Sequence, residues 1–158
     1  MNFLEQLAAE WYECQGYFVR TNAKANRRSK GGWDNELDVL AFNPGTKELV
    51  HLETSWDALT WEGRETRFLT KKFVFTDLQY AELVGHPPSK ITKRAIVGTS
   101  KASPGSLWGK DIHVTTVPTF VAEIAVWLRP KHPLRDVIPE NFPRLRALQF
   151  GIHYGAGS

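Results

Sequence analysis

The stretch that decides the fold runs from Asn35 to Ser55 and reads NELDVLAFNPGTKELVHLETS. Its two halves, 36–42 and 48–55, combine aliphatic residues with an alternation of apolar and polar side chains, which is typical of β-strands. Between them, residues 43–46 (Asn-Pro-Gly-Thr) place proline and glycine where a tight turn needs them. The stretch therefore predicts a β-hairpin.

Alternation along the hairpin predicts which side chains share a face of the sheet. In the first strand, one face is expected to carry Leu37, Val39 and Ala41, and the other Glu36, Asp38, Leu40 and Phe42. In the second strand, one face is expected to carry Leu49, His51, Glu53 and Ser55, and the other Val50, Leu52 and Thr54. Charged residues thus interrupt strands that are otherwise made of apolar residues.

Helical and extended patterns surround the hairpin on both sides. Apolar residues at spacings of three and four predict helices over 3–14, 62–84, 118–128 and 139–150, with a second helix beginning near Thr76 inside the long pattern. Asn2 and Glu5 form the sequence pattern of a capping box for the first helix. Short strands are expected over 17–21, 94–99 and 112–117, a loop over 100–110 and a frayed tail over 155–158. This order indicates an α/β domain over 1–130, followed by a helical extension and flexible tail over 131–158.

Composition places the chain among ordinary globular proteins. It has 158 residues, of which 42% are hydrophobic and 23% charged. Cys14 is the only cysteine, which excludes an internal disulfide and a zinc site built from several thiolates. No apolar run approaches the roughly 20 residues that cross a bilayer, and the acid at Glu5 is unlike the start of a signal peptide. We therefore expect a cytoplasmic protein without a membrane partner.

A polar, basic stretch between the first two strands suggests a polyanionic partner. Lys24, Arg27, Arg28 and Lys30 lie among asparagines and glycines, and the whole chain carries a net charge of +3. A flexible basic loop can follow a phosphate backbone, and Trp33 beside it can stack on an exposed base. The alternative is a solvated loop that binds nothing.

Three acids are the candidates for chemistry. Asp38 and Glu53 lie in neighbouring strands that are otherwise apolar, where an unpaired carboxylate is costly to bury. Glu10, on the first helix, is expected to lean over the sheet towards the same point. Carboxylates that converge in this way suit Mg²⁺ or Mn²⁺, which prefer oxygen ligands and keep several waters.

The arrangement of these residues resembles the PD-(D/E)XK nuclease superfamily. The similar pieces are Glu10 on a helix, Asn35-Glu36-Leu37-Asp38 in one strand, and His51-Leu52-Glu53-Thr54-Ser55 in its hairpin partner, within roughly residues 3–99. The resemblance implies a restriction-endonuclease-like αβββαβ core, with a mixed central sheet flanked by helices. It further implies that Asp38 and Glu53 hold a metal ion, that Glu10 assists, and that DNA, in preference to RNA, is cleaved. Many nucleases of this fold act as homodimers.

The sequence departs from the superfamily pattern at Ser55, which stands where a catalytic lysine is expected. A serine donates a hydrogen bond but carries no positive charge. Lys71 and Lys72, in the following helix, are candidates to replace that lysine. Two alternatives stay open: a catalytically inactive module that binds nucleic acid or serves in an assembly, and a purely structural role for the acids, paired with Arg64 or Lys71.

Two neighbouring residues have plainer interpretations. His51 shares a strand face with Glu53, and packing within the sheet is its expected role. Asp57, just beyond Ser55, is expected to cap the loop that follows the strand.

Overall fold

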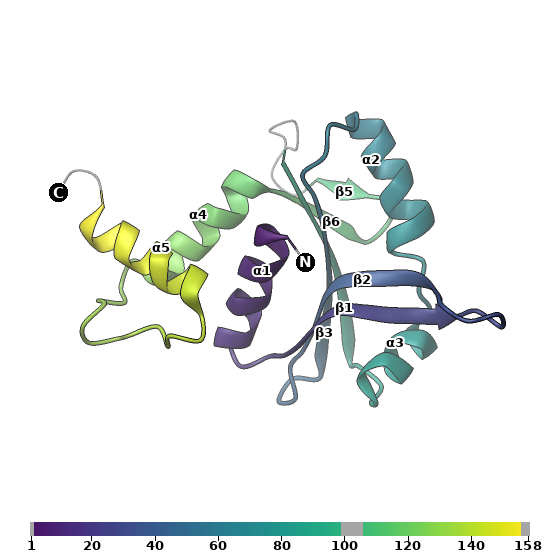
Figure 1. Cartoon of the computed structure of the whole chain (residues 1–158), viewed down its shortest axis with the longest axis horizontal. Coiled ribbons are helices and arrows are strands. Elements are labelled where there is room, and N and C mark those ends of the chain that lie inside the picture. Colours follow the sequence, from purple (N-terminus) through teal and green to yellow (C-terminus); the bar gives the residue numbers. More distant parts are fainter. Residues whose placement is uncertain (1, 99–105, 156–158) are drawn as a thin grey trace.

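The computed structural model describes residues 2–98 and 106–155. Most of the expected loop over 100–110, Thr99 of the expected strand over 94–99 and most of the expected tail fall outside these residues. Within them the fold is mixed α/β, with a six-stranded sheet in the order β1-β2-β3-β4-β6-β5 (Figure 1). The strands are β1 (Phe18–Arg27), β2 (Trp33–Phe42), β3 (Glu48–Ser55), β4 (Lys90–Val97), β5 (Leu107–Trp108) and β6 (Ile112–Thr116).

The sheet is mixed in direction. β1, β2 and β3 form an antiparallel meander, β4 runs parallel to β3, and β6 runs parallel to β4. The short β5 lies antiparallel to β6 at one edge. As a result the carboxyl ends of β3, β4 and β6 meet at one end of the sheet, which is where parallel sheets usually place their ligands.

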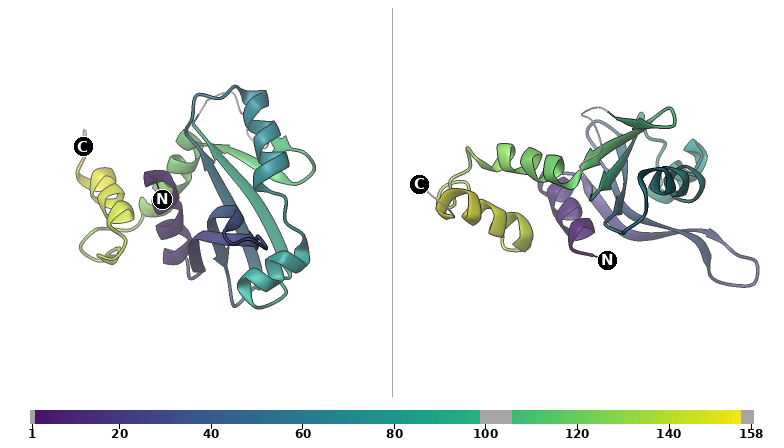
Figure 2. Two further views of the ribbon diagram at one scale, coloured as in Figure 1. Left: turned by 45° about the vertical axis from the view of Figure 1, so that its right-hand side comes forward. Right: turned by 90° about the horizontal axis from the view of Figure 1, so that it is seen from above.

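Helices cover both faces of the sheet (Figures 1 and 2). On one face lie α1 (Phe3–Cys14) and α4 (Val117–Leu128), with α5 (Pro143–Tyr154) packed against them on the side away from the sheet. On the other face lie α2 (Trp61–Arg67), the π-helical segment η1 (Phe68–Lys72) and α3 (Asp77–Val84). The capping box of α1 is present, and Thr76 caps a separate α3, as the sequence predicts. None of the helices in the described residues is long and apolar enough to cross a membrane.

The C-terminal segment shares the main core. Ile138, Phe142 and Leu145 are buried together with residues of α1, α4 and the sheet. Helix α5 begins at Pro143, four residues later than Pro139, where the sequence places its start. A proline fits the first turn of a helix, because the missing N–H has no partner there in any case, so either proline was compatible with the pattern.

The first two strands are longer than the sequence predicts, and this is the main correction to the fold. The expected loop through Lys24 and Arg27 is instead the outer half of β1, and β2 begins at Trp33 instead of Glu36. Pairing continues out to Arg27 and Trp33. Polar side chains do not prevent pairing here, because the outer halves of β1 and β2 are largely exposed to solvent. The two strands still supply hydrogen-bond partners for each other's backbone N–H and C=O groups.

The alternation expected for β2 breaks at Asp38. Val39 and Ala41 pack on the α1 side, but Leu37 packs with Leu40 and Leu49 on the α3 side. In β1, Asn22 faces this point with a left-handed backbone (φ 50°). The hairpin ribbon thus turns where β2 separates from β3, and Asp38 lies at the turn.

Candidate active site

Two carboxylates meet where β2 leaves β3. Backbone pairing between the two strands ends at Val39 and Leu52. Beyond it, side chains take over: the Asp38 N–H donates to Glu53 Oε1 (3.2 Å), and the Thr54 N–H donates to Asp38 Oδ2 (2.9 Å). The separation of the strands is therefore what creates room for the acids and fixes them in place.

Lys72 completes the cluster from the end of η1. Its ammonium nitrogen lies 2.5 Å from Glu53 Oε2 and 3.2 Å from Asp38 Oδ1. The Glu53 side chain is fully buried, whereas those of Asp38 and Lys72 keep 14% and 19% exposure. Buried charges need a partner of opposite sign, and here one cation serves two anions. The cluster opens to solvent on the side of Asp38 and Lys72.

A buried hydrogen-bonded chain orients Glu53 from behind. His51 Nε2 lies 2.8 Å from Glu53 Oε1, and His51 Nδ1 lies 2.7 Å from the Tyr80 hydroxyl. Both rings are completely buried. With Glu53 ionised, the consistent assignment has Tyr80 donating to His51 and His51 donating to Glu53. This leaves Oε2 of Glu53 directed at Lys72, with no hydrogen bond from the other described residues.

The surroundings move the pKa values of the three charged groups apart. Burial, and then the negative charge of Glu53, raise the pKa of Asp38 above its ordinary value. Burial alone would raise the pKa of Glu53 too, but the hydrogen bond from His51 and the charge of Lys72 outweigh it and lower that pKa. Burial would lower the pKa of Lys72, but Glu53 and Asp38 outweigh it and raise it. Lys72 is therefore a cation at neutral pH.

Ser55, Lys71 and Lys72 were the residues considered for the lysine of the superfamily pattern, and their side chains have three different environments. Lys72 reaches both acids, whereas the side chain of Lys71 is exposed and only its carbonyl oxygen is used, accepting a hydrogen bond from Asn35 (3.2 Å). Ser55 is buried and donates to Asp57 (2.9 Å). Of the two lysines proposed from the sequence, Lys72 is the one that the fold brings to the acids.

Asp57 organises the loop after β3, as expected of a capping residue. It accepts the Leu59 N–H (3.1 Å) and pairs with Arg64 (3.2 Å) and Arg67 (2.6 Å). Burial would raise its pKa, but these partners and Ser55 outweigh burial and lower it. Arg64, one of the cations that the sequence offered as a partner for Asp38 or Glu53, therefore pairs with Asp57.

Glu10 does not lean towards the other acids, contrary to the expectation from sequence. Its carboxylate accepts the N–H groups of Arg144 (2.9 Å) and Leu145 (3.0 Å) and pairs with the Arg144 guanidinium (2.8 Å). These are the first amides of α5, so Glu10 caps that helix from α1. The sequence pattern could not reveal this role, because the partner lies more than 130 positions away.

The acid of α1 that lies nearest the site is Glu5. The Thr54 hydroxyl oxygen lies 3.2 Å from Asp38 Oδ2 and 3.5 Å from Glu5 Oε1. Glu5 also belongs to the capping box with Asn2. The capping box marks Glu5 as a residue of the first turn of α1, and the fold sets that turn against the carboxyl end of β3. It was the sequence feature that could have drawn attention to Glu5.

Two carboxylates, and not a larger ligand set, define the possible metal site. Within residues 2–98 and 106–155, no group of three or more His, Cys, Asp or Glu side chains is placed to hold a metal ion. Glu53 Oε2 and Asp38 Oδ1 nevertheless converge on one cation, the Lys72 ammonium. Mg²⁺ is commonly held by one or two carboxylates plus waters. The residues present therefore fit a Mg²⁺ or Mn²⁺ ion of this kind.

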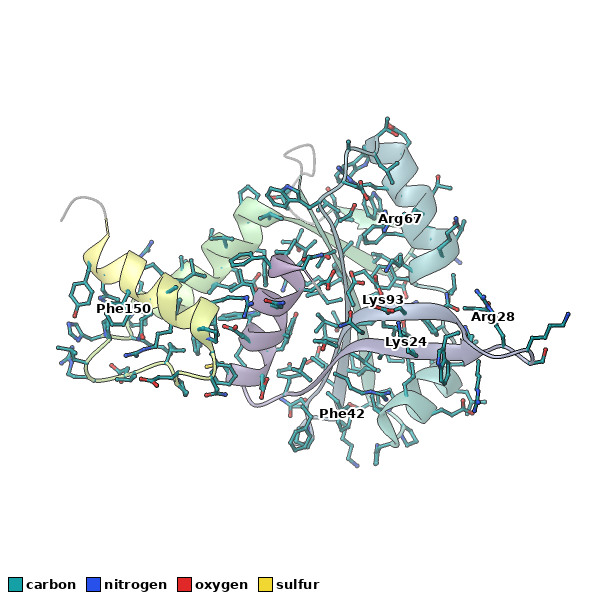
Figure 3. The ribbon with its side chains drawn as sticks, viewed as in Figure 1. Lys24, Arg28, Phe42, Arg67, Lys93 and Phe150 are labelled. Atoms are coloured by element: carbon teal, nitrogen blue, oxygen red, sulfur yellow. The ribbon has the colours of Figure 1, made fainter. Side chains whose placement is uncertain are left out.

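The residues expected to contact nucleic acid lie on the β1–β2 ribbon, which projects from the sheet (Figures 2 and 3). Residues 20–36 hold five basic and two acidic side chains, a net charge of +3. Lys24 pairs with Glu36, and Arg28 with Asp34. Between the ribbon and α3 lies a groove of about 390 Å³, whose lining includes Lys24, Arg27 and Trp33; Trp33 is 45% exposed. Lys30 is exposed in the loop at the tip.

No protein-family model matches the chain, and no curated protein sequence matches it.

Proposed function

We propose that the protein is a metal-dependent nuclease that hydrolyses phosphodiester bonds of DNA. The observation that carries the proposal is the convergence of Asp38, Glu53 and Lys72 at the point where β2 leaves β3. The element order α1-β1-β2-β3, followed by helices and a β4 parallel to β3, supports a restriction-endonuclease-like core. The basic ribbon beside the site gives a surface for the phosphate backbone.

The chain's own groups have distinct roles in this proposal. Asp38 and Glu53 would hold Mg²⁺ or Mn²⁺, which supplies an activated water and stabilises charge on the attacked phosphate. Tyr80 and His51 keep the second oxygen of Glu53 directed into the site. Lys72, whose pKa the two acids raise, donates hydrogen bonds and offsets the charge that develops on the phosphate.

A second candidate function is a binding module without catalysis. It is favoured by one observation: Lys72 pairs with both acids, so a protein group already offsets part of their charge without a metal ion. Such a module would bind nucleic acid in a salt-dependent manner without metal-dependent turnover.

A cleavage assay separates the two candidates. Labelled single-stranded, duplex and branched DNA, and RNA of matching sequence, are incubated with the protein in Mg²⁺, Mn²⁺ or EDTA. The proposal expects metal-dependent products that Asp38→Ala abolishes and that Asp136→Asn, an exposed acid remote in sequence, leaves unchanged. Products that Asp38→Ala still makes at the wild-type rate contradict the assignment, and a salt-sensitive gel shift without products favours the binding module.

A further inference from the structure

An apolar pocket lies between the first turns of α1 and α4, on the face of the sheet opposite η1 and α3. It encloses about 410 Å³ and is lined by Phe3, Leu4, Leu7, Trp56, Val117 and Val121, with Asn2 at its rim. Trp56 directly follows β3, and Val117 directly follows β6. The pocket therefore lies at the carboxyl ends of the parallel strands, the same end of the sheet as Glu53.

Two large aromatic side chains line this pocket yet stay exposed to solvent. Phe3 is 66% exposed and Trp56 is 68% exposed. The Trp56 ring lies against the backbone at Gly98: a Cβ there would be 3.3 Å from the ring, and the Gly98 N–H donates to the Ser55 carbonyl oxygen (3.0 Å). A ring held in place but left uncovered offers a stacking surface at little cost in conformational entropy.

The pocket connects to the acids through two short contacts. Asn2 Nδ2 lies 3.4 Å from the Thr54 hydroxyl oxygen, which lies 3.2 Å from Asp38 Oδ2. The side chains of Asn2 and Thr54 thus link the pocket to Asp38, so a base in the pocket and a phosphate at Asp38 would belong to the same stretch of one strand. The first turn of α4 holds no acid and adds partial positive charge, which suits an adjoining phosphate, whereas Glu5 offsets the charge at the first turn of α1.

On the basis of the nuclease function proposed above, we propose that this pocket holds one unstacked base of the strand that is cleaved. The substrate class is then a single strand, or a frayed or unpaired segment, because a base within a duplex must first leave its stack to reach Trp56. The pocket distinguishes the bases poorly, since the Asn2 side chain is already engaged with Glu5 and Thr54 and the other walls are apolar. Stacking is tolerant of base identity for the same reason.

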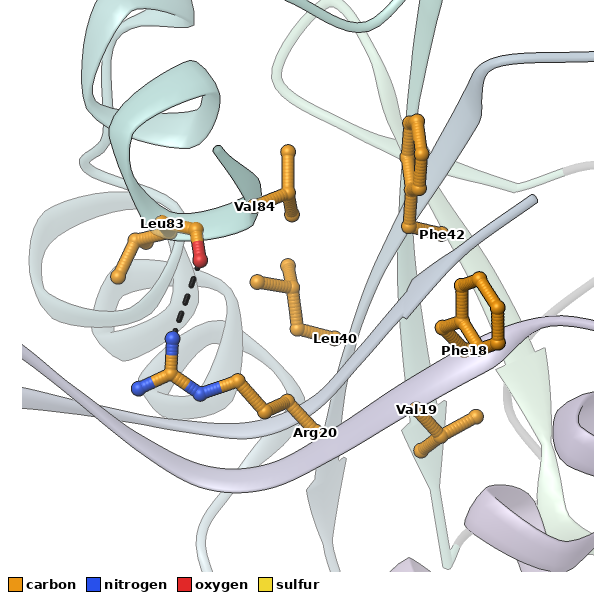
Figure 4. A pocket seen from close by; sticks show the side chains of 7 residues that line it. All are labelled: Phe18, Val19, Arg20, Leu40, Phe42, Leu83 and Val84. Carbon is orange, nitrogen blue, oxygen red and sulfur yellow. Dashed lines mark hydrogen bonds between the residues drawn. The ribbon is translucent and has the colours of Figure 1, made fainter. Parts of the chain in front are cut away.

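Binding measurements without cleavage test this proposal. Fluorescence anisotropy in EDTA compares wild type, Trp56→Ala and Trp56→Phe on a labelled single-stranded oligonucleotide. The matched control is Phe18→Ala, which removes a 71% exposed aromatic from a smaller apolar pocket between β1, β2 and α3 (Figure 4). Loss of one base stack weakens binding by about 5- to 150-fold, so Trp56→Ala is expected in that range. Trp56→Phe retains most of the affinity, and Phe18→Ala all of it.

A scan with abasic nucleotides excludes an indirect effect of the substitution on folding. One abasic position weakens binding to wild type and has no further effect on Trp56→Ala, because the same contact is already lost. Trp56→Ala that binds like wild type, or that responds to every abasic position as wild type does, overturns the proposal. Cleavage is measured separately. If the protein never cleaves DNA but shows the abasic effect, the base pocket is supported and the proposed nuclease function is contradicted.

Discussion

Replacing Lys72 by methionine tests the electrostatics of the acid cluster. The substitution keeps an unbranched side chain of similar length but removes the cation shared by Glu53 Oε2 and Asp38 Oδ1. Removing one partner of a buried ion pair costs about 3–5 kcal/mol. Because Lys72 and Asp38 keep some contact with solvent, we expect a smaller loss of about 2–3 kcal/mol. For a chain of this length about 1 kcal/mol shifts Tm by about 2–4 °C, so Tm falls by about 4–12 °C.

Thermal unfolding in EDTA and in Mg²⁺, over pH 5 to 8, measures this effect. In the variant, loss of the Lys72 charge raises the pKa of Asp38 further above its unfolded value. The contribution of Asp38 to the free energy of unfolding is then greatest at low pH and is lost as pH rises through the folded pKa, so the deficit relative to wild type widens between pH 5 and 8. Mg²⁺ binds the folded site and restores part of the lost stability of the variant, more than it adds to wild type.

Glu53→Gln in the Lys72→Met background is the control. It removes one of the two uncompensated charges, so the double variant is expected to be more stable than Lys72→Met alone at pH 8. A Lys72→Met protein that unfolds at the wild-type temperature throughout this pH range would refute the picture of one cation holding two buried acids.

Three further predictions concern the ribbon, the β3 loop and α5. Arg27→Ala and Lys30→Ala should each reduce the slope of log binding constant against log salt by about 0.7 on single strands; unchanged slopes would remove the ribbon from the interface. Asp57 has a folded pKa below its unfolded value, so its contribution is present above about pH 4 and lost as pH falls through the folded pKa; the Tm gap between wild type and Asp57→Asn should close in acid, and a constant gap would contradict this. Glu10→Ala removes charge-assisted bonds to the start of α5 and should cost about 1–3 kcal/mol, seen as faster hydrogen exchange confined to α5; uniform exchange rates would show that Glu10 is no cap.

Local patterns in the sequence were sufficient for most helices and strands. The hairpin around residues 43–46 forms, Leu49 and Val50 take the opposite faces expected of them, and Thr76 starts a helix. These features depend on short-range geometry: turn chemistry, alternation and capping. The outer ribbon was missed because its composition is that of a solvated loop, and composition does not show that two polar segments will pair.

The contacts of individual side chains were harder to predict than the helices and strands. Asp38 and Glu53 were found because a charged residue inside an apolar strand is conspicuous. The sequence offered Lys71 and Lys72 as candidate cations beside these acids, and the fold brings Lys72, in the last turn of η1, into contact with them. Glu10 was assigned to the wrong partner, since its distance from α5 along the chain conceals their contact. Tyr80 gave no signal, because only the tertiary fold brings α3 to His51.

The most direct test of the central claim is single-turnover cleavage of an end-labelled single-stranded DNA across a Mg²⁺ titration, with wild type and Glu53→Gln. Glu53→Gln keeps the shape of the side chain and removes the charge that a metal ion requires. The proposed function predicts a wild-type rate that rises with Mg²⁺ and saturates, and a variant whose rate stays at background at every Mg²⁺ concentration. Equal rates in the two proteins, or a wild-type rate that does not respond to Mg²⁺, would contradict it.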